Sequence, residues 1–191
     1  MEELLTKIKE RIDLSPEAEA HLLSISSQKA FRKDAILIRE GQEVKTVFFV
    51  QKGCLRSYCT DQLGKEHTLQ FAISGWWISD YLAIHTQEQA NLNVECLQDS
   101  IVIQFQAADL DAMLHAFPEF EPFQRRLLER HLVSLQKRIL NQLQLTAAER
   151  YELFLSQYGD IEQYTRNYHI ASYLGITQQS LSRIRFEKLK R

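Results

Sequence analysis

The stretch from Asn167 to Phe186, NYHIASYLGITQQSLSRIRF, constrains the fold of this chain more than any other. It reads as two short helices joined at Gly175, where a chain leaving a helix adopts the positive φ that glycine takes without strain. Thr177 is a favourable N-cap for the second helix, and small Ala171 allows the two helices to cross closely. The apolar positions of the two helices are Ile170, Leu174, Ile176, Leu181 and Ile184. This spacing predicts a DNA-binding helix-turn-helix.

The second predicted helix carries polar side chains on the face away from Leu181 and Ile184. These side chains are Gln178, Gln179, Ser182 and Arg183. Gln pairs with adenine, Arg with guanine, and Ser with several base edges, so this face is predicted to read bases in a major groove. A second group is expected either to touch phosphates or to support the motif: Thr177, Arg185, Lys188 and Tyr168.

The charge distribution favours the same function. Residues 165–191 hold six basic side chains and one acid, a net charge of +5 on a chain whose net charge is −2, so the remainder carries −7. A basic end on an acidic body suits phosphate contacts at that end only. The alternative is a helical hairpin whose basic end is merely solvated.

Between Ala30 and Phe105 the sequence changes to short β segments separated by turns. Leu55–Thr60 and Glu66–Phe71, for example, flank a turn that contains Gly64. Such a series predicts an antiparallel barrel or jelly roll. The expected fold is therefore α+β, with a β-roll sensor domain and flanking helices in residues 1–117, a long dimerisation helix in 118–144, and a small helix-turn-helix domain in 145–191.

The order of these parts resembles that of the Crp/Fnr transcription regulators. The resemblance is carried by REGQ, a strand, and VFFVQKGCLRSYCTDQLGKEHTLQFAISGWWISD, followed by a long helix and a helix-turn-helix. It covers residues 34–190 and implies a symmetric dimer that binds double-stranded DNA at a near-palindromic site, with RNA polymerase as a further expected partner. It also implies that the β-roll resembles a cyclic-nucleotide-binding domain and biases the orientation of the two DNA-binding domains.

In the family members that bind cyclic AMP, a Gly-Glu pair and a later Arg-Ser or Arg-Thr pair hold the ribose and the phosphate. The corresponding pairs here are Ser79-Asp80 and Ala90-Asn91, and no arginine lies between Arg56 and Arg125. We therefore expect an effector other than cyclic AMP or cyclic GMP, if there is one. An apolar or aromatic compound is one interpretation and simple filling of the barrel is the other, because the segment is rich in aromatic residues: Phe71, Trp76, Trp77 and Tyr81. With Gly75, Ser79, Asp80, Ala90 and Asn91 they form the possible effector pocket.

The long helix carries an apolar seam at spacings of four, three and four. The seam consists of Leu128, Leu132, Leu135 and Ile139. This a/d pattern predicts a dimer interface over about two heptads. Packing of the seam onto the chain's own barrel is the alternative.

Other features limit the function classes. Cys54, Cys59 and Cys96 form no CxxC and are expected to be buried thiols, and the six histidines lack metal-ligand spacings, so we expect no metal and no cofactor. No nucleophile–base pair or paired carboxylates stand out, so the protein is not expected to be an enzyme. Without an apolar run or a signal peptide, it is expected to be cytoplasmic, away from membranes. The alternative function is a ligand-sensing or protein-interaction module that does not bind specific DNA sequences.

Overall fold

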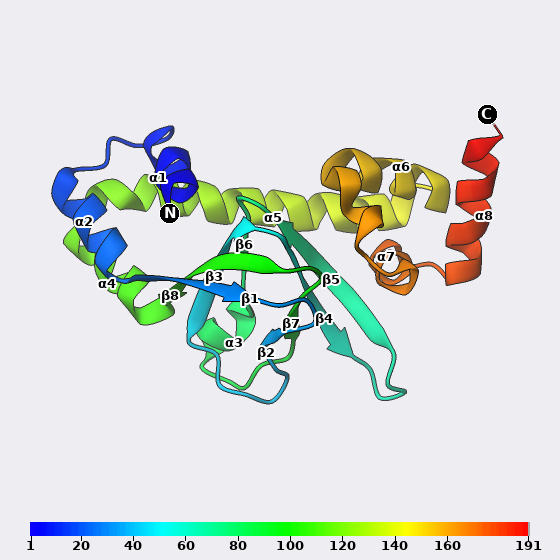
Figure 1. The fold of residues 1–191 in the computed structure, drawn as a ribbon, viewed down its shortest axis with the longest axis horizontal. Helices are drawn as coiled ribbons and strands as arrows, with labels where there is room; N and C mark the ends of the chain where they lie inside the picture. Colours follow the sequence, from blue (N-terminus) through cyan, green and yellow to red (C-terminus); the bar gives the residue numbers. More distant parts are fainter. Residues whose placement is uncertain (191) are drawn as a thin grey trace. The chain divides into compact units, whose positions relative to one another are not determined.

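The computed structural model describes residues 1–190 and contains two four-stranded sheets and a set of helices (Figure 1). The first sheet has the order β1-β8-β3-β6 and pairs antiparallel throughout. Its strands are β1 (Ser26–Phe31), β8 (Ser100–Gln106), β3 (Thr46–Lys52) and β6 (Trp77–Ile78). The second sheet has the order β2-β7-β4-β5. Its strands are β2 (Ile36–Ile38), β7 (Asn93–Cys96), β4 (Cys54–Thr60) and β5 (Glu66–Ile73).

Two hydrophobic clusters stabilise this β-roll. One contains side chains from both sheets, including Phe48, Val50, Leu55 and Val94, and fills the interior of the roll. The other joins Phe49, Ile103 and Phe105 of the first sheet to Phe120 and Phe123 and to three flanking helices. These helices are α1 (Glu2–Lys9), α2 (Pro16–Ser24) and α4 (Ala107–Ala116). Burial of these apolar faces accounts for the helices that flank the roll.

The remaining helices follow the roll along the chain. They are η1 (Pro118–Phe120), α5 (Glu121–Gln144), α6 (Ala147–Tyr158), η2 (Gly159–Gln163), α7 (Asn167–Leu174) and α8 (Gln178–Leu189). Thr146 ends the link between α5 and α6 with a capping box: its hydroxyl accepts the N–H of Glu149, whose carboxylate accepts the N–H of Thr146 at 2.8 Å. This pairing satisfies N–H groups that a helix start leaves without partners.

These elements confirm the predicted fold class. The structure adds one helix that the sequence analysis did not predict, α3 (Tyr81–Thr86), and its first strand begins at Ser26 rather than near Ala30. By their contacts, the residues form two compact units, Met1–Ser57 with Phe71–Arg130, and Tyr58–Gln70 with the chain from His131 onward. The boundaries at 117 and 144 stay a prediction.

Candidate nucleic-acid interface

The helix-turn-helix is built from α7, a tight turn and α8. Gly175 adopts a φ of +69°, and the N–H of Ile176 donates to the carbonyl of Ala171 at 3.0 Å, which closes the end of α7. The hydroxyl of Thr177 accepts the N–H of Ser180 at 3.1 Å and so begins α8. The buried apolar side chains of the motif are Ile170, Ala171, Leu174 and Leu181, and His169 is buried beside them. The turn and cap predicted from sequence are therefore present.

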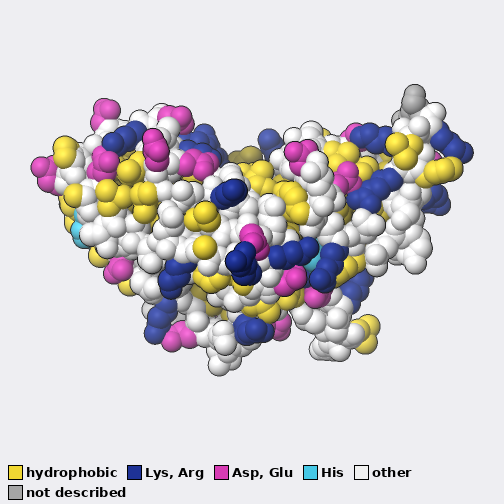
Figure 2. Space-filling model, in the orientation of Figure 1, with side chains coloured by type: hydrophobic (Ala, Val, Ile, Leu, Met, Phe, Trp, Pro, Cys, Tyr) yellow, Lys and Arg dark blue, Asp and Glu magenta, His cyan; other side chains and the backbone are white. Residues whose placement is uncertain are grey.

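The face of α8 that was predicted to read bases is exposed to solvent. Gln178, Gln179, Ser182 and Arg183 are all exposed. Figure 2 shows Lys and Arg side chains gathered over α8, at the right of the view. The first turn of α8 places the two glutamines beside N–H groups that carry the positive end of the helix dipole. The face thus combines donors and acceptors for base edges with a positive potential, and its base contacts stay a prediction.

Arg185 lies on a different side of α8 and contacts the unit's own residues. Its guanidinium forms an ion pair with Glu162 and donates to the hydroxyl of Tyr151 at 3.2 Å and to Oδ1 of Asn167 at 2.7 Å. Burial lowers the pKa of Arg185, but the hydrogen bonds to Tyr151 and Glu162 outweigh it and raise the pKa above its ordinary value. Of the two roles expected for Arg185, these contacts favour support of the motif.

Lys188 makes a similar contact on the same helix. Its Nζ lies 2.8 Å from a carboxylate oxygen of Glu152 in α6, in an ion pair that remains largely exposed. Such a pair is weak and a phosphate could compete for the ammonium group. A phosphate contact therefore stays a prediction for Lys188.

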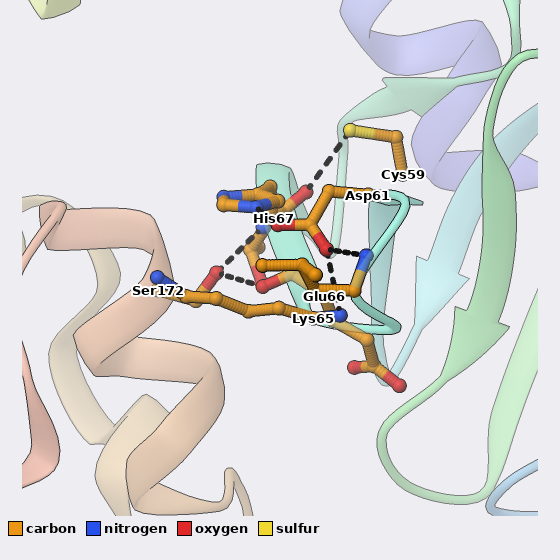
Figure 3. Close-up of polar contacts among 8 residues, drawn as sticks. Cys59, Asp61, Lys65, Glu66, His67 and Ser172 are labelled. Atoms are coloured by element: carbon orange, nitrogen blue, oxygen red, sulfur yellow. Dashed lines mark hydrogen bonds and ion pairs between the residues drawn. The ribbon is translucent and has the colours of Figure 1, made fainter.

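The tip of the β4–β5 hairpin packs against α7, which the sequence analysis missed. We call residues Tyr58–Gln70 the hairpin arm. The hydroxyl of Ser172 donates to the carbonyl of Glu66 at 2.8 Å and accepts the N–H of Thr68 at 2.8 Å. Figure 3 shows Ser172 reaching from α7 to β5, where it replaces a neighbouring strand for two backbone groups. Only the serine itself, a small polar residue on the first helix of the motif, could have signalled this contact.

Arg138 in α5 strengthens the same contact. Its guanidinium donates to the carbonyls of Leu69, of Thr68 at 2.8 Å and of Tyr173 at 3.2 Å, and lies over the ring of Tyr173 at 4.3 Å from its centre. One side chain therefore joins α5, the hairpin arm and α7. Charged donors to backbone carbonyls form strong hydrogen bonds, so the arm is held firmly.

A hollow of about 810 Å³ lies between the hairpin arm and the start of α8. From the arm it is lined by Gly64, Lys65, Glu66 and His67. From the helix-turn-helix it is lined by Tyr168, Ala171, Ser172, Gly175, Ile176, Thr177, Gln178 and Gln179. Four residues predicted to contact DNA or to support the motif thus share a hollow with the tip of the arm: Tyr168, Thr177, Gln178 and Gln179.

The predicted seam of α5 is exposed along its length. Leu128 is 54% exposed, Leu132 57%, Leu135 43% and Ile139 61%. Further exposed apolar residues of the same helix are Val133, Leu140 and Leu143. Within residues 1–190, therefore, the side chains of the seam are exposed to solvent, and an apolar stripe of this kind marks an interaction surface.

The segment that would hold a cyclic nucleotide is closed by its own residues. Asp80 is fully buried, and its carboxylate accepts the N–H of Ala83 at 3.1 Å and of Asn91 at 2.8 Å. Ser79 donates to the carbonyl of Thr46 at 2.7 Å, and Ala90 is buried in the interior cluster. The oxygens of this buried carboxylate already accept two N–H groups, and residues 79–91 contain no lysine or arginine that would offset the charge of a phosphate.

The aromatic residues predicted near this segment occupy different places. Phe71 is fully buried, and Trp76 packs against the interior cluster. Trp77 lies between Phe49 and Phe105 in the cluster beneath the helices, with ring centres 5.3 and 5.5 Å away. Burial raises the pKa of Tyr81 above its usual range. Trp77 therefore packs beneath the helices rather than in the interior of the roll, so these aromatic residues do not share one location.

Chemical groups that could hold a metal are dispersed. Cys54 and Cys96 are buried as expected, and burial raises the pKa of Cys96 to about 11, but Cys59 is only half-buried in the hairpin arm. Over residues 1–190 no three His, Cys, Asp or Glu side chains are grouped as metal ligands would be. None of the helices in this part of the chain is both long and apolar enough to span a bilayer.

Comparison with known proteins agrees with the fold described above. Residues 28–117 match the model of the cyclic nucleotide-binding domain family. The fumarate and nitrate reduction regulatory protein of Vibrio cholerae is 27% identical over 177 residues, which cover 86% of this chain and 70% of that protein. The solved structure of FixK2 from Bradyrhizobium japonicum is similar, with a TM-score of 0.73 at 19% identity, over 85% of this chain and 84% of that one. A structure from Eubacterium rectale, described as a transcriptional regulator of the Crp/Fnr family, has a TM-score of 0.73 at 17% identity and covers 93% and 85%.

Proposed function

We propose that this chain, which belongs to the Crp/Fnr family of DNA-binding transcription regulators, acts as a homodimer that reads a near-palindromic site without control by cyclic AMP. The observation that carries the proposal is α8, which is capped by Thr177 and presents Gln178, Gln179, Ser182 and Arg183 to solvent. In a helix-turn-helix this is the helix that enters the major groove, and its first residues contact base edges.

The stripe on α5 supports the dimer. Two copies of α5 packed side by side would cover leucine and isoleucine side chains that one chain leaves about half exposed. A two-fold axis along such a pair brings two copies of α8 to successive major grooves on one face of the duplex. A symmetric protein would then select a symmetric site.

Asp80 supports independence from cyclic nucleotides. Its buried carboxylate binds two backbone N–H groups in the segment where the resemblance places the phosphate, and no arginine of that segment supplies a positive charge. An effector of another kind, contact with RNA polymerase and a location in the cytoplasm belong to the same proposal. The proposed role requires no catalytic chemistry, so the protein is not an enzyme in this proposal.

The test is selection of the purified protein against a pool of random duplexes, followed by binding measurements over a range of salt concentrations. We expect a two-fold symmetric motif whose affinity falls steeply as salt rises, because phosphate contacts release counterions. Arg183→Ala should weaken binding to the selected site by about 1–3 kcal/mol and leave binding to unrelated DNA nearly unchanged. Arg39→Ala, which removes an exposed arginine of the other compact unit, is the matched control.

Three results would contradict the proposal. Enrichment of no motif together with salt-independent binding would favour a ligand-sensing or protein-interaction module. If Arg183→Ala lost the same binding free energy on selected and on unrelated DNA, a base-reading role for this residue would be excluded. Binding of the selected site only in the presence of cyclic AMP would exclude the proposed independence.

A further inference from the structure

The hairpin arm, residues Tyr58–Gln70, is joined by its contacts to the unit that carries the helix-turn-helix, although it lies in the β-roll part of the sequence. Ser172 bonds to two backbone groups of β5, and Arg138 bonds to two carbonyls of the same strand. The arm is therefore fixed relative to α7 and α8. A fixed element beside a reading helix can add contacts to the same partner without an ordering cost.

The turn at the tip of the arm is also ordered. The carboxylate of Asp61 accepts the N–H groups of Leu63 at 2.9 Å and Lys65 at 3.0 Å, and its other oxygen lies 2.8 Å from Nε2 of His67 (Figure 3). These bonds hold Lys65 at the end of the turn, where its side chain is exposed. The backbone N–H groups and His67 offset the charge of Asp61, while Glu66 is the second acid at the tip.

The tip and the start of α8 face one hollow. Lys65 and His67 line it from the arm, and Thr177, Gln178 and Gln179 line it from α8. A major groove that receives the first turn of α8 is flanked by its own phosphate strands, so one strand must pass beside that turn. Lys65 and the positive end of the α8 dipole would then meet the same stretch of sugar–phosphate backbone.

We propose that the hairpin arm is a second DNA-contacting element, in which Lys65 binds a backbone phosphate next to the base-reading start of α8. This inference rests on the proposed function and adds to it a contact from outside the helix-turn-helix. The contact is to phosphate, so it strengthens binding to any sequence and fixes the position of α8 on the duplex.

The experiment measures fluorescence anisotropy of two labelled duplexes, the selected site and an unrelated sequence, with the full chain at several salt concentrations. Lys65→Ala should weaken binding to both duplexes by about eightfold per subunit at 0.1 M salt. It should also lower the slope of log K against log salt by about 0.9 per subunit, the value for one lost phosphate contact. Lys65→Arg should retain both values, and Lys65→Glu should weaken binding further.

Lys52→Ala is the matched control, because it removes an exposed lysine from β3 in the other compact unit. It should change neither the affinity nor the slope. A slope and affinity for Lys65→Ala equal to those of the unaltered chain would overturn the inference while leaving the proposed function intact. Failure of the unaltered chain to bind either duplex would instead reject the proposed function and this contact together.

Discussion

The exposed stripe of α5 yields a quantitative prediction for the double substitution Leu132→Ala and Ile139→Ala. Leu132 is 57% exposed and Ile139 61% exposed, so a symmetric dimer would bury the exposed parts of four side chains. Full burial of a leucine or isoleucine contributes about 1.5–3 kcal/mol, so the exposed part contributes about 1–2 kcal/mol for each side chain. Since alanine retains a methyl group, we expect the double variant to lose about 4 kcal/mol of association free energy, a rise of roughly a thousandfold in the dimer dissociation constant.

Sedimentation equilibrium over a range of protein concentrations measures this constant directly. Leu82→Ala is the matched control, because Leu82 is 58% exposed on α3 and lies off the stripe. Circular dichroism of each variant would show that the fold is retained. A dimer constant that shifts by less than tenfold in the double variant, or equally in the control, would refute the dimer seam.

Two further predictions concern local geometry. Gly175→Ala should lower the free energy of unfolding by about 1 kcal/mol or more, as measured by urea denaturation. The φ of +69° at this position disfavours a side chain, and the added Cβ would lie 3.0 Å from the amide oxygen of Gln142. An unchanged denaturation midpoint would contradict the role of the turn. The hydrogen bond to His67, followed by those to Lys65 and Leu63, lowers the pKa of Asp61. These bonds therefore stabilise the tip of the arm at pH values above the ordinary aspartate pKa. The stabilisation is lost as the pH falls through the lowered pKa. NMR titration of the Asp61 carboxylate should find this lowered pKa, and Asp61→Asn should remove the pH dependence of the tip.

The helix-turn-helix could be predicted because its signals are local. Gly175, the Thr177 cap and the buried positions Ile170, Leu174 and Leu181 act within about twenty residues, and each has its expected conformation or burial. The capping box at Thr146 and Glu149 is local in the same way. Such signals depend on backbone geometry more than on distant partners, so they can be recognised in a single sequence.

Asp80 shows how one local signal can support two interpretations. In the sequence it was compared with a ligand-binding glutamate, although an aspartate before Tyr81–Thr86 is also a good N-cap. In the structure its carboxylate caps α3 and binds the N–H of Asn91. The sequence could suggest the missing positive charge of this segment, but not that a buried carboxylate would occupy its N–H groups.

The hairpin arm could not be predicted because its anchors lie far apart in the sequence. Ser172 and Glu66 are separated by 106 residues, and Arg138 and Leu69 by 69. Ser172 is one of several polar residues on a short helix, and nothing in its neighbours indicates that its hydroxyl bonds to a β-strand. The contact matters for how the DNA-binding part is defined, because a fragment limited to residues 145–191 would lack both Arg138 and the strand that Ser172 binds. We therefore infer that the functional reading unit is assembled from two separate segments, and that base contacts from α8 and a phosphate contact from Lys65 should be tested in the full chain.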